Sequence, residues 1–151
     1  MDSQIIEIIG LNRLVNDLLA AGVEVARPIR DRGVDLIAYI ERDKKSFWAR
    51  PIQLKAASEE NFIINKKYSR ATDLLLVYYW HLHSKNHPVA YAMSYATAVQ
   101  IAAKMGYTKN ATWTRNGIWT VHKPGRDLKV LMEPYQMNPD RWKKAVFNSM
   151  A

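Results

Sequence analysis

The sequence contains no cysteine. This absence excludes a disulfide framework, thiol catalysis and a cysteine-ligated zinc site, and it agrees with a cytoplasmic location as the expectation. Long hydrophobic runs are missing as well. The longest, residues 74–80, is far too short to span a bilayer, and residues 1–10 lack the features of a signal peptide. We therefore expect a protein with no membrane partner.

Positive charge is in excess. The chain has 22 Lys and Arg against 14 Asp and Glu, which gives a net charge of +8. Such a balance predicts a polyanionic partner, with nucleic acid as the first expectation. A basic surface that only keeps the protein soluble is the alternative.

The 151 residues are 48% hydrophobic and contain no low-complexity tract, so we expect a single domain over 1–151.

Hydrophobic periodicity gives a mixed pattern of helices and strands. Helices are expected at 3–21, 94–104 and from 138 to 150. Strands are expected at 23–26, 34–41, 47–57, 73–80 and 89–93, and possible short elements at 62–64 and in 65–73. Residues 113–114 and 118–122 are expected to pair as a hairpin around Asn116-Gly117. The predicted fold class is α/β, with α+β as the alternative.

Polar groups stand where strands that only build a core do not need them. Asp35 begins one strand, and Gln53 and Lys55 lie on the same face of the next, because side chains alternate along a strand. The turn between these strands is centred near residue 44, midway between 35 and 53. A hairpin would therefore bring an acid, an amide oxygen and an ammonium group together.

The first helix supplies a further acid. Glu7 is on the line of Leu11, Leu14 and Leu18, which predicts that its carboxylate points toward the packed face; a wet carboxylate near the helix start is the alternative. The oxygens of Asp35 and Gln53, with the backbone carbonyl of Leu54, could hold Mg²⁺ or Mn²⁺. Lys55 could orient a water or neutralise the charge that develops on a phosphoryl group. A simple cross-strand salt bridge between Asp35 and Lys55 is the other interpretation.

Asp35, followed after seventeen residues by Gln53-Leu54-Lys55, resembles the PD-(D/E)XK nuclease superfamily in its QxK form. The segments 22–25 and 33–36, with Pro28, are similar to its restriction-endonuclease-like and Holliday-junction-resolvase-like members. The resemblance covers residues 5 to about 80. It implies a restriction-endonuclease-like core over about 3–80, made of a helix, a β-meander, a second helix and a further strand in a central mixed sheet flanked by helices. Residues 81–151 would form a strand–helix extension.

The resemblance also implies roles for individual residues. Asp35 would be a metal ligand, Gln53 would replace the usual acidic ligand, Lys55 would be the catalytic lysine, and Glu7 would be the first-helix acid of some members. The implied activity is metal-dependent endonucleolytic hydrolysis of DNA. A catalytically weak or inactive module of the same fold, which binds nucleic acid or a protein, is the alternative, and a homodimer is possible because cutting both strands needs two sites.

Basic residues flank the predicted site on both sides along the chain. We expect them to contact DNA phosphates, with the aromatic ring of Tyr68 stacking on a base. The expected contacts are Arg27, Arg30, Arg32, Lys66, Lys67, Tyr68 and Arg70.

Overall fold

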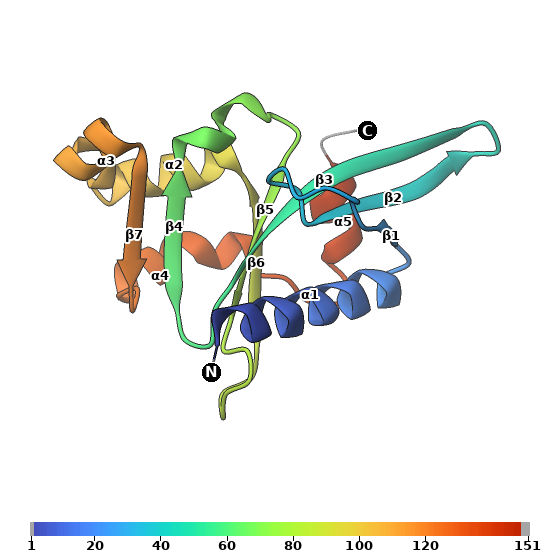
Figure 1. Ribbon diagram of the computed structural model, residues 1–151, viewed down its shortest axis with the longest axis horizontal. Helices are drawn as coiled ribbons and strands as arrows, with labels where there is room; N and C mark the ends of the chain where they lie inside the picture. The colour runs from blue at the N-terminus through green and yellow to red at the C-terminus, as the bar shows by residue number, and fades with distance from the viewer. Residues whose placement is uncertain (1, 149–151) are drawn as a thin grey trace.

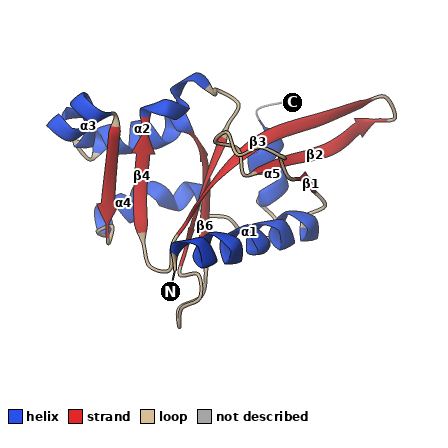
Figure 2. Ribbon diagram, in the orientation of Figure 1, coloured by secondary structure: helices blue, strands red, loops and turns tan. Residues whose placement is uncertain are grey.

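The computed structural model describes residues 2–148 and is a mixed α/β structure built on a five-stranded sheet (Figures 1 and 2). The strand order is β1-β2-β3-β5-β6, in which β3 and β5 are parallel and the other neighbours are antiparallel. The strands β4 and β7 form a separate antiparallel pair. The strands are β1 (Glu24–Ala26), β2 (Leu36–Asp43), β3 (Ser46–Ala56), β4 (Asn61–Asn65), β5 (Leu75–Trp80), β6 (Val89–Ser94) and β7 (Ile118–His122).

Helices lie on both faces of the main sheet (Figure 2). The α-helices are α1 (Ser3–Ala20), α2 (Tyr95–Lys104), α3 (Ala111–Asn116), α4 (Arg126–Met132) and α5 (Trp142–Phe147). The short 3-10 helices are η1 (Lys66–Arg70), η2 (Tyr107–Lys109) and η3 (Glu133–Tyr135).

The central strand β5 is buried along its whole length, as its apolar sequence predicts. Leu75, Val77 and Tyr79 belong to a core shared with α1 and α5. The residues between them belong to a second core, shared with α2, α4 and the β4–β7 pair. The sheet is therefore the middle of three layers.

Helix α1 begins and ends as its sequence predicts. The side chain of Asp2 accepts a hydrogen bond from the Gln4 amide, and Gly22 adopts the left-handed conformation (φ 81°) just after the helix. Gly10 is buried where the helix crosses β3. A Cβ atom at this position would lie 2.8 Å from the Cβ of Ala56 and 2.9 Å from Cδ1 of Leu82. The close approach of α1 to β3 therefore requires glycine here.

We expect Gly10→Ala to lower the free energy of unfolding by about 1–3 kcal/mol, because the added methyl group overpacks the α1–β3 contact. Gly125→Ala is the matched control, since a Cβ there meets no atom within 4 Å. Urea unfolding of both variants measures the difference. Equal stability of the two variants would contradict this account of the contact.

Strands β2 and β3 form a long hairpin that projects from the body of the protein (Figure 1). Pro51 cannot donate a ladder hydrogen bond, which favours a position at a strand edge or a bulge. It lies where β3 is paired with β2 only, because pairing with β5 starts at Ile52. After Ile52, β3 is paired with β5 only, and the edge that faces the β2 side is unpaired. The predicted site lies at this edge.

The connection between the parallel strands β3 and β5 differs from the one that the resemblance implies. It contains β4 and η1 in place of a second helix. Residues 61–65 alternate between half-buried and buried positions, with Phe62 and Ile64 inward, a period that suits a strand and not a helix. Helix α2, which follows β6, covers this face of the sheet instead.

The expected hairpin over 113–122 is wrong. Trp113 lies in α3, which Asn110 caps, and Gly117 ends that helix in the left-handed conformation. The partner of β7 is β4. Helix α4 is not predicted from the sequence, and the last helix begins at Trp142 instead of 138, while its expected end at 149–150 is outside the described residues.

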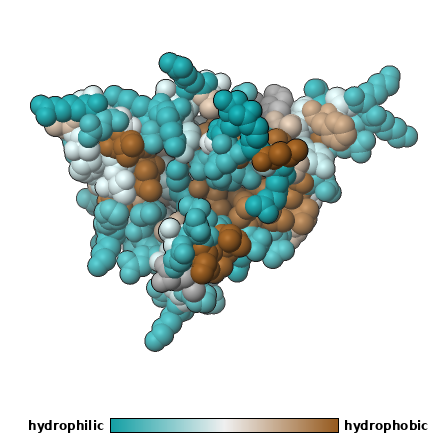
Figure 3. All heavy atoms as spheres, viewed as in Figure 1, coloured by the Kyte–Doolittle hydropathy of each residue, from teal (hydrophilic) through white to brown (hydrophobic). Residues whose placement is uncertain are grey.

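Apolar residues gather over α1 on the face shown in Figure 3. Within α1, the side chains of Ile5, Ile8 and Leu19 are exposed, with 46%, 59% and 48% of their surface accessible. None of the helices in the described part of the chain is both long enough and apolar enough to cross a membrane.

Candidate functional site

Asp35 lies at the point where β2 ends its pairing with β3. Its amide donates to the carbonyl of Ile52 (2.8 Å), and its Oδ2 accepts from the amide of Leu54 (2.7 Å). The carboxylate thus accepts the Leu54 hydrogen bond that a backbone carbonyl would accept if the pairing of β2 with β3 continued. Burial raises the pKa of Asp35, and the nearby Asp31 charge adds to this; the Leu54 hydrogen bond and Lys55 counteract it.

Gln53 has one satisfied and one unsatisfied polar atom. Its Nε2 donates to the carbonyl of Leu54 (3.3 Å), whereas its Oε1 is buried and has no hydrogen-bond partner in the described part of the chain. A buried acceptor without a donor is unfavourable, typically by about 1–3 kcal/mol. This oxygen is therefore suited to a group that the described chain does not provide.

Lys55 is held by an aromatic residue from η1. Its Nζ donates to the hydroxyl of Tyr68 (2.9 Å) and lies 5.0 Å from the centre of the Tyr68 ring. Burial lowers the pKa of Lys55, while Asp35 and Glu7 counteract this effect. Within the described residues no ion pair joins Asp35 to Lys55. The salt-bridge interpretation of these two residues is therefore not what the structure contains.

The three predicted residues line one cleft of about 370 Å³. Helix α1, the segment before β2, the open edge of β3 and η1 form its walls. The lining residues are Glu7, Ile8, Leu11, Arg27, Asp31, Gly33, Asp35, Gln53, Leu54, Lys55, Lys67 and Tyr68. The predicted convergence of Asp35, Gln53 and Lys55 is thus present.

Glu7 reaches the cleft, but not as predicted. The buried line of α1 consists of Ile6, Gly10, Leu14 and Leu18, and Glu7 is exposed. Its carboxylate therefore belongs to the rim of the cleft and remains hydrated, and the expectation of a packed position is wrong. Glu7 does lie close enough to Lys55 for its charge to affect the pKa of the lysine, as expected for a member of the same cluster.

Only some of the predicted basic contacts lie at the cleft. Arg27 and Lys67 line it, whereas Arg30, Arg32 and Arg70 are exposed outside it. The ammonium of Lys66 lies over the ring of Trp113 (5.0 Å), in the direction of α3.

Tyr68 does not offer a free ring to a base. Its side chain is only 5% exposed, and the ammonium groups of Lys55 and Lys67 lie 5.0 and 5.1 Å from its ring centre. The expectation of base stacking is therefore corrected to a role in holding Lys55. Sequence reasoning missed this role because the contact joins residues of two different elements.

Asp31 also lines the cleft and was not among the residues predicted from the sequence. Its side chain accepts a hydrogen bond from the Gly33 amide.

Three residues that line the cleft carry oxygen atoms of the kind that a hard divalent cation prefers. Oδ1 of Asp35 has no hydrogen bond to a described residue, and Oε1 of Gln53 is buried and unsatisfied. The carbonyl of Leu54 points to the same edge as its amide, because both groups of a strand residue face one side. The described residues contain no group of three or more His, Asp or Glu that could hold a metal, so amide and backbone oxygens would have to complete the set.

Comparison with known proteins finds no relative, so a proposal for the function has to be argued from the sequence and from the geometry of the cleft. No family model matches the chain, and neither a curated protein nor a solved structure matches it.

Proposed function

We propose that the protein is a metal-dependent endonuclease-like hydrolase of DNA, with Asp35, Gln53 and Lys55 as its catalytic cluster. The observation that carries the proposal is the convergence of three residues on one cleft: Asp35, Lys55 and Gln53, whose Oε1 is buried and unsatisfied among the described residues. A core-building strand edge does not need this combination. The PD-(D/E)XK resemblance of the motif and the net charge of +8 are in agreement with it.

Each residue of the cluster has a distinct role in the proposal. Asp35, Gln53 and the Leu54 carbonyl would hold Mg²⁺ or Mn²⁺, and Glu7 at the rim would bind one of its waters. When bound, the ion would lower the pKa of a coordinated water and polarise the phosphoryl oxygen. Lys55, held by Tyr68, stabilises the negative charge that develops on the phosphate. Arg27 and Lys67 bind the flanking phosphates.

The direct test is cleavage of circular duplex, junction and single-stranded DNA with Mg²⁺, Mn²⁺ or EDTA. The proposal predicts metal-dependent cleavage that Asp35→Ala abolishes in a folded variant. Cleavage that persists in Asp35→Ala, or that is equal in EDTA, would contradict it. If duplex is the substrate, both strands must be cut, and we then expect a homodimer in solution.

Gln53→Glu tests the ligand set. A carboxylate binds a divalent cation more strongly than a neutral amide, because metal affinity rises with ligand charge. We therefore expect half-maximal cleavage at a lower Mg²⁺ concentration than in the wild type. Gln53→Leu removes the oxygen and should raise the requirement. If neither variant changes the metal dependence, Gln53 is not a ligand.

Tyr68→Phe tests the positioning of Lys55. The variant keeps the ring and loses the hydroxyl that accepts from Nζ, so Lys55 is no longer fixed in place. We expect kcat to fall about 10-fold, within the range seen for partners that orient a functional group, with little change in DNA affinity. A loss of affinity at constant kcat would instead assign Tyr68 to DNA contact.

The second candidate is a binding module of the same fold that lacks cleavage activity. The neutral Gln53 favours it, since a site in which Asp35 is the single carboxylate among the proposed ligands holds Mg²⁺ weakly. Salt-dependent DNA binding by the wild type without cleavage of any substrate would select this candidate.

A further inference from the structure

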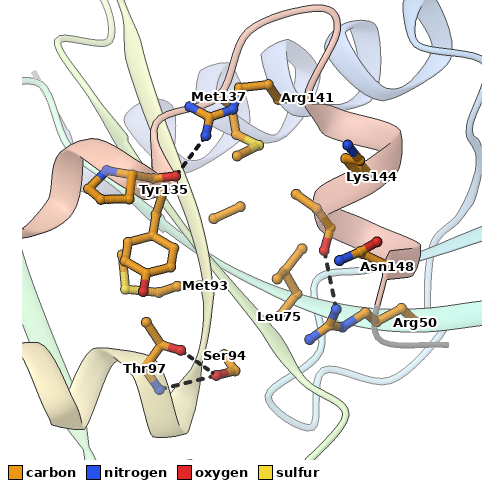
Figure 4. Close-up of a pocket in the computed structure, with 13 residues that line it drawn as sticks. Arg50, Leu75, Met93, Ser94, Thr97, Tyr135, Met137, Arg141, Lys144 and Asn148 are labelled. Atoms are coloured by element: carbon orange, nitrogen blue, oxygen red, sulfur yellow. Dashed lines mark hydrogen bonds between the residues drawn. The ribbon is translucent and has the colours of Figure 1, made fainter. Parts of the chain in front are cut away.

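The projecting β2–β3 hairpin has two faces, and the described cores cover only one of them. The covered face carries Trp48, Arg50 and Ile52, and helix α5 lies against it. Arg50 donates to the carbonyls of Ala145 (3.3 Å) and Val146 (3.0 Å), and Figure 4 shows its guanidinium hydrogen-bonded to this helix. The opposite face of the hairpin has no such cover from the described cores.

This opposite face is apolar. Residues that pair directly across antiparallel strands point to the same face. The register of β1, β2 and β3 therefore brings six apolar or aromatic residues together as the hairpin face: Ala26, Ile37, Tyr39, Phe47, Ala49 and Pro51. All six are exposed or half-buried, and none belongs to either described core. The Phe47 side chain is 65% exposed, and its ring packs edge-on against that of Tyr39 at 5.9 Å. Such an uncovered apolar surface is typical of an interaction site.

The charges that border the hairpin face are equal in number and opposite in sign. Glu24 and Glu41 pair across the strands with residues of the face, so both acids belong to it. Lys44 and Lys45 form the turn at its end. All four residues are exposed, and none forms an ion pair with another described residue.

Two further charges at the end of the hairpin leave this balance unchanged. Arg42 lies over the ring of Trp48 (5.0 Å) on the covered face. Asp43 accepts hydrogen bonds from the Lys45 amide (2.8 Å) and the Ser46 hydroxyl (3.2 Å) within the turn. The end of the hairpin is therefore neutral on a chain whose net charge is +8. A neutral apolar surface does not attract DNA, but it lets two basic copies approach with the least repulsion.

We propose that the hairpin face binds a second copy of this chain in an antiparallel, twofold arrangement. In a twofold contact the same patch meets itself, so the patch has to be self-complementary. Along the hairpin, Phe47 lies between Glu24 and the lysines of the turn. A twofold axis near Phe47 therefore brings the lysines of each copy to the acids of the other and the two Phe47 rings to the centre. The contact needs neither DNA nor a metal ion and is independent of the proposed nuclease activity.

The test is analytical ultracentrifugation of the full chain without DNA or metal, from micromolar to millimolar concentration. We expect a reversible dimer with a Kd of about 10–100 μM, because a hairpin face is smaller than a standard stable interface. Phe47→Glu should weaken the dimer at least about tenfold, since it places two like charges at the centre of the contact. Circular dichroism checks that the variant is folded.

Val130→Glu is the matched control for Phe47→Glu. Val130 is also exposed (52%) and belongs to neither described core. It lies in α4, at the other end of the molecule from the hairpin (Figure 1). Its substitution adds the same charge and should change the Kd of the dimer by less than about twofold.

Charge reversal tests the orientation of the two copies. The double variant Glu24→Lys with Glu41→Lys removes the acids, and Lys44→Glu with Lys45→Glu removes the lysines. Each double variant should weaken the dimer about tenfold, because like charges then face each other. All four substitutions together restore complementarity and leave the net charge at +8, so the Kd should return to within about threefold of the wild type.

Four results would overturn the proposal. A monomer at every concentration leaves the hairpin face without a second copy, and equal losses in Phe47→Glu and Val130→Glu would place the contact elsewhere. A variant with all four charges reversed that does not regain affinity would reject the twofold arrangement. If the wild type is monomeric and Phe47→Glu, but not Val130→Glu, weakens DNA binding, the face binds nucleic acid instead.

Discussion

Asp35→Asn is expected to abolish DNA cleavage while making the metal-free protein more stable. The asparagine oxygen can still accept from the Leu54 amide, so the ladder remains closed. The substitution removes the charge that the proposed metal site requires, and we expect a loss in kcat/KM of about 10³-fold or more, the several kcal/mol that a catalytic metal supplies.

The stability effect follows from the pKa of Asp35, which burial raises above its usual value. A carboxyl whose pKa is higher in the folded state favours folding when protonated, and this contribution is lost as the pH rises through the folded-state pKa. At neutral pH the ionised Asp35 therefore destabilises the fold. Melting temperatures in EDTA should show Asp35→Asn above the wild type at pH 7, with the difference vanishing at acid pH. A variant less stable than the wild type at pH 7 would assign the carboxylate a structural role.

Lys55→Met is expected to lower kcat by about 10²–10³-fold, the usual effect of removing a group that stabilises transition-state charge. Methionine keeps much of the length and removes the ammonium. Because the proposed ligands are untouched, the Mg²⁺ requirement and the folded state should persist. Single-turnover cleavage with saturating enzyme measures this loss without interference from product release.

Lys67→Met is the matched control for Lys55→Met. Lys67 lines the same cleft and lies over the same Tyr68 ring, but it is exposed. Its loss should weaken DNA binding in a salt-dependent way and leave kcat nearly unchanged. If Lys67→Met reduces kcat as much as Lys55→Met does, the ammonium groups act through the overall charge of the cleft, and Lys55 has no special catalytic position.

The convergence of Asp35, Gln53 and Lys55 could be predicted because it depends on local rules. Side-chain alternation and a hairpin turn near residue 44 fix which residues face each other, and the observed pairing of Leu36 with Ile52 follows. The β5 strand was also predictable, since a strand covered on both faces is apolar throughout. These features need no knowledge of the distant parts of the chain.

The parts that were missed depend on contacts between distant segments. Asn116-Gly117 is a strong hairpin signal, but the same Gly in the left-handed conformation also ends a helix, and only the pairing of β7 with the distant β4 decides between the two. Glu7 follows a helical line of leucines, yet the face of α1 that packs on β3 is set by Gly10, where close approach is possible. The contact of Tyr68 with Lys55 has no signal in either segment.

The most direct test of the central claim is Mn²⁺ titration of the full chain, observed as paramagnetic broadening of amide signals. It needs no DNA substrate. The account predicts broadening centred on Asp35 and residues 53–55, which Asp35→Asn removes and Gln53→Glu shifts to lower Mn²⁺ concentration. Broadening centred on Glu59 and Glu60, or unchanged in Asp35→Asn, would contradict a metal site at the open edge of β3.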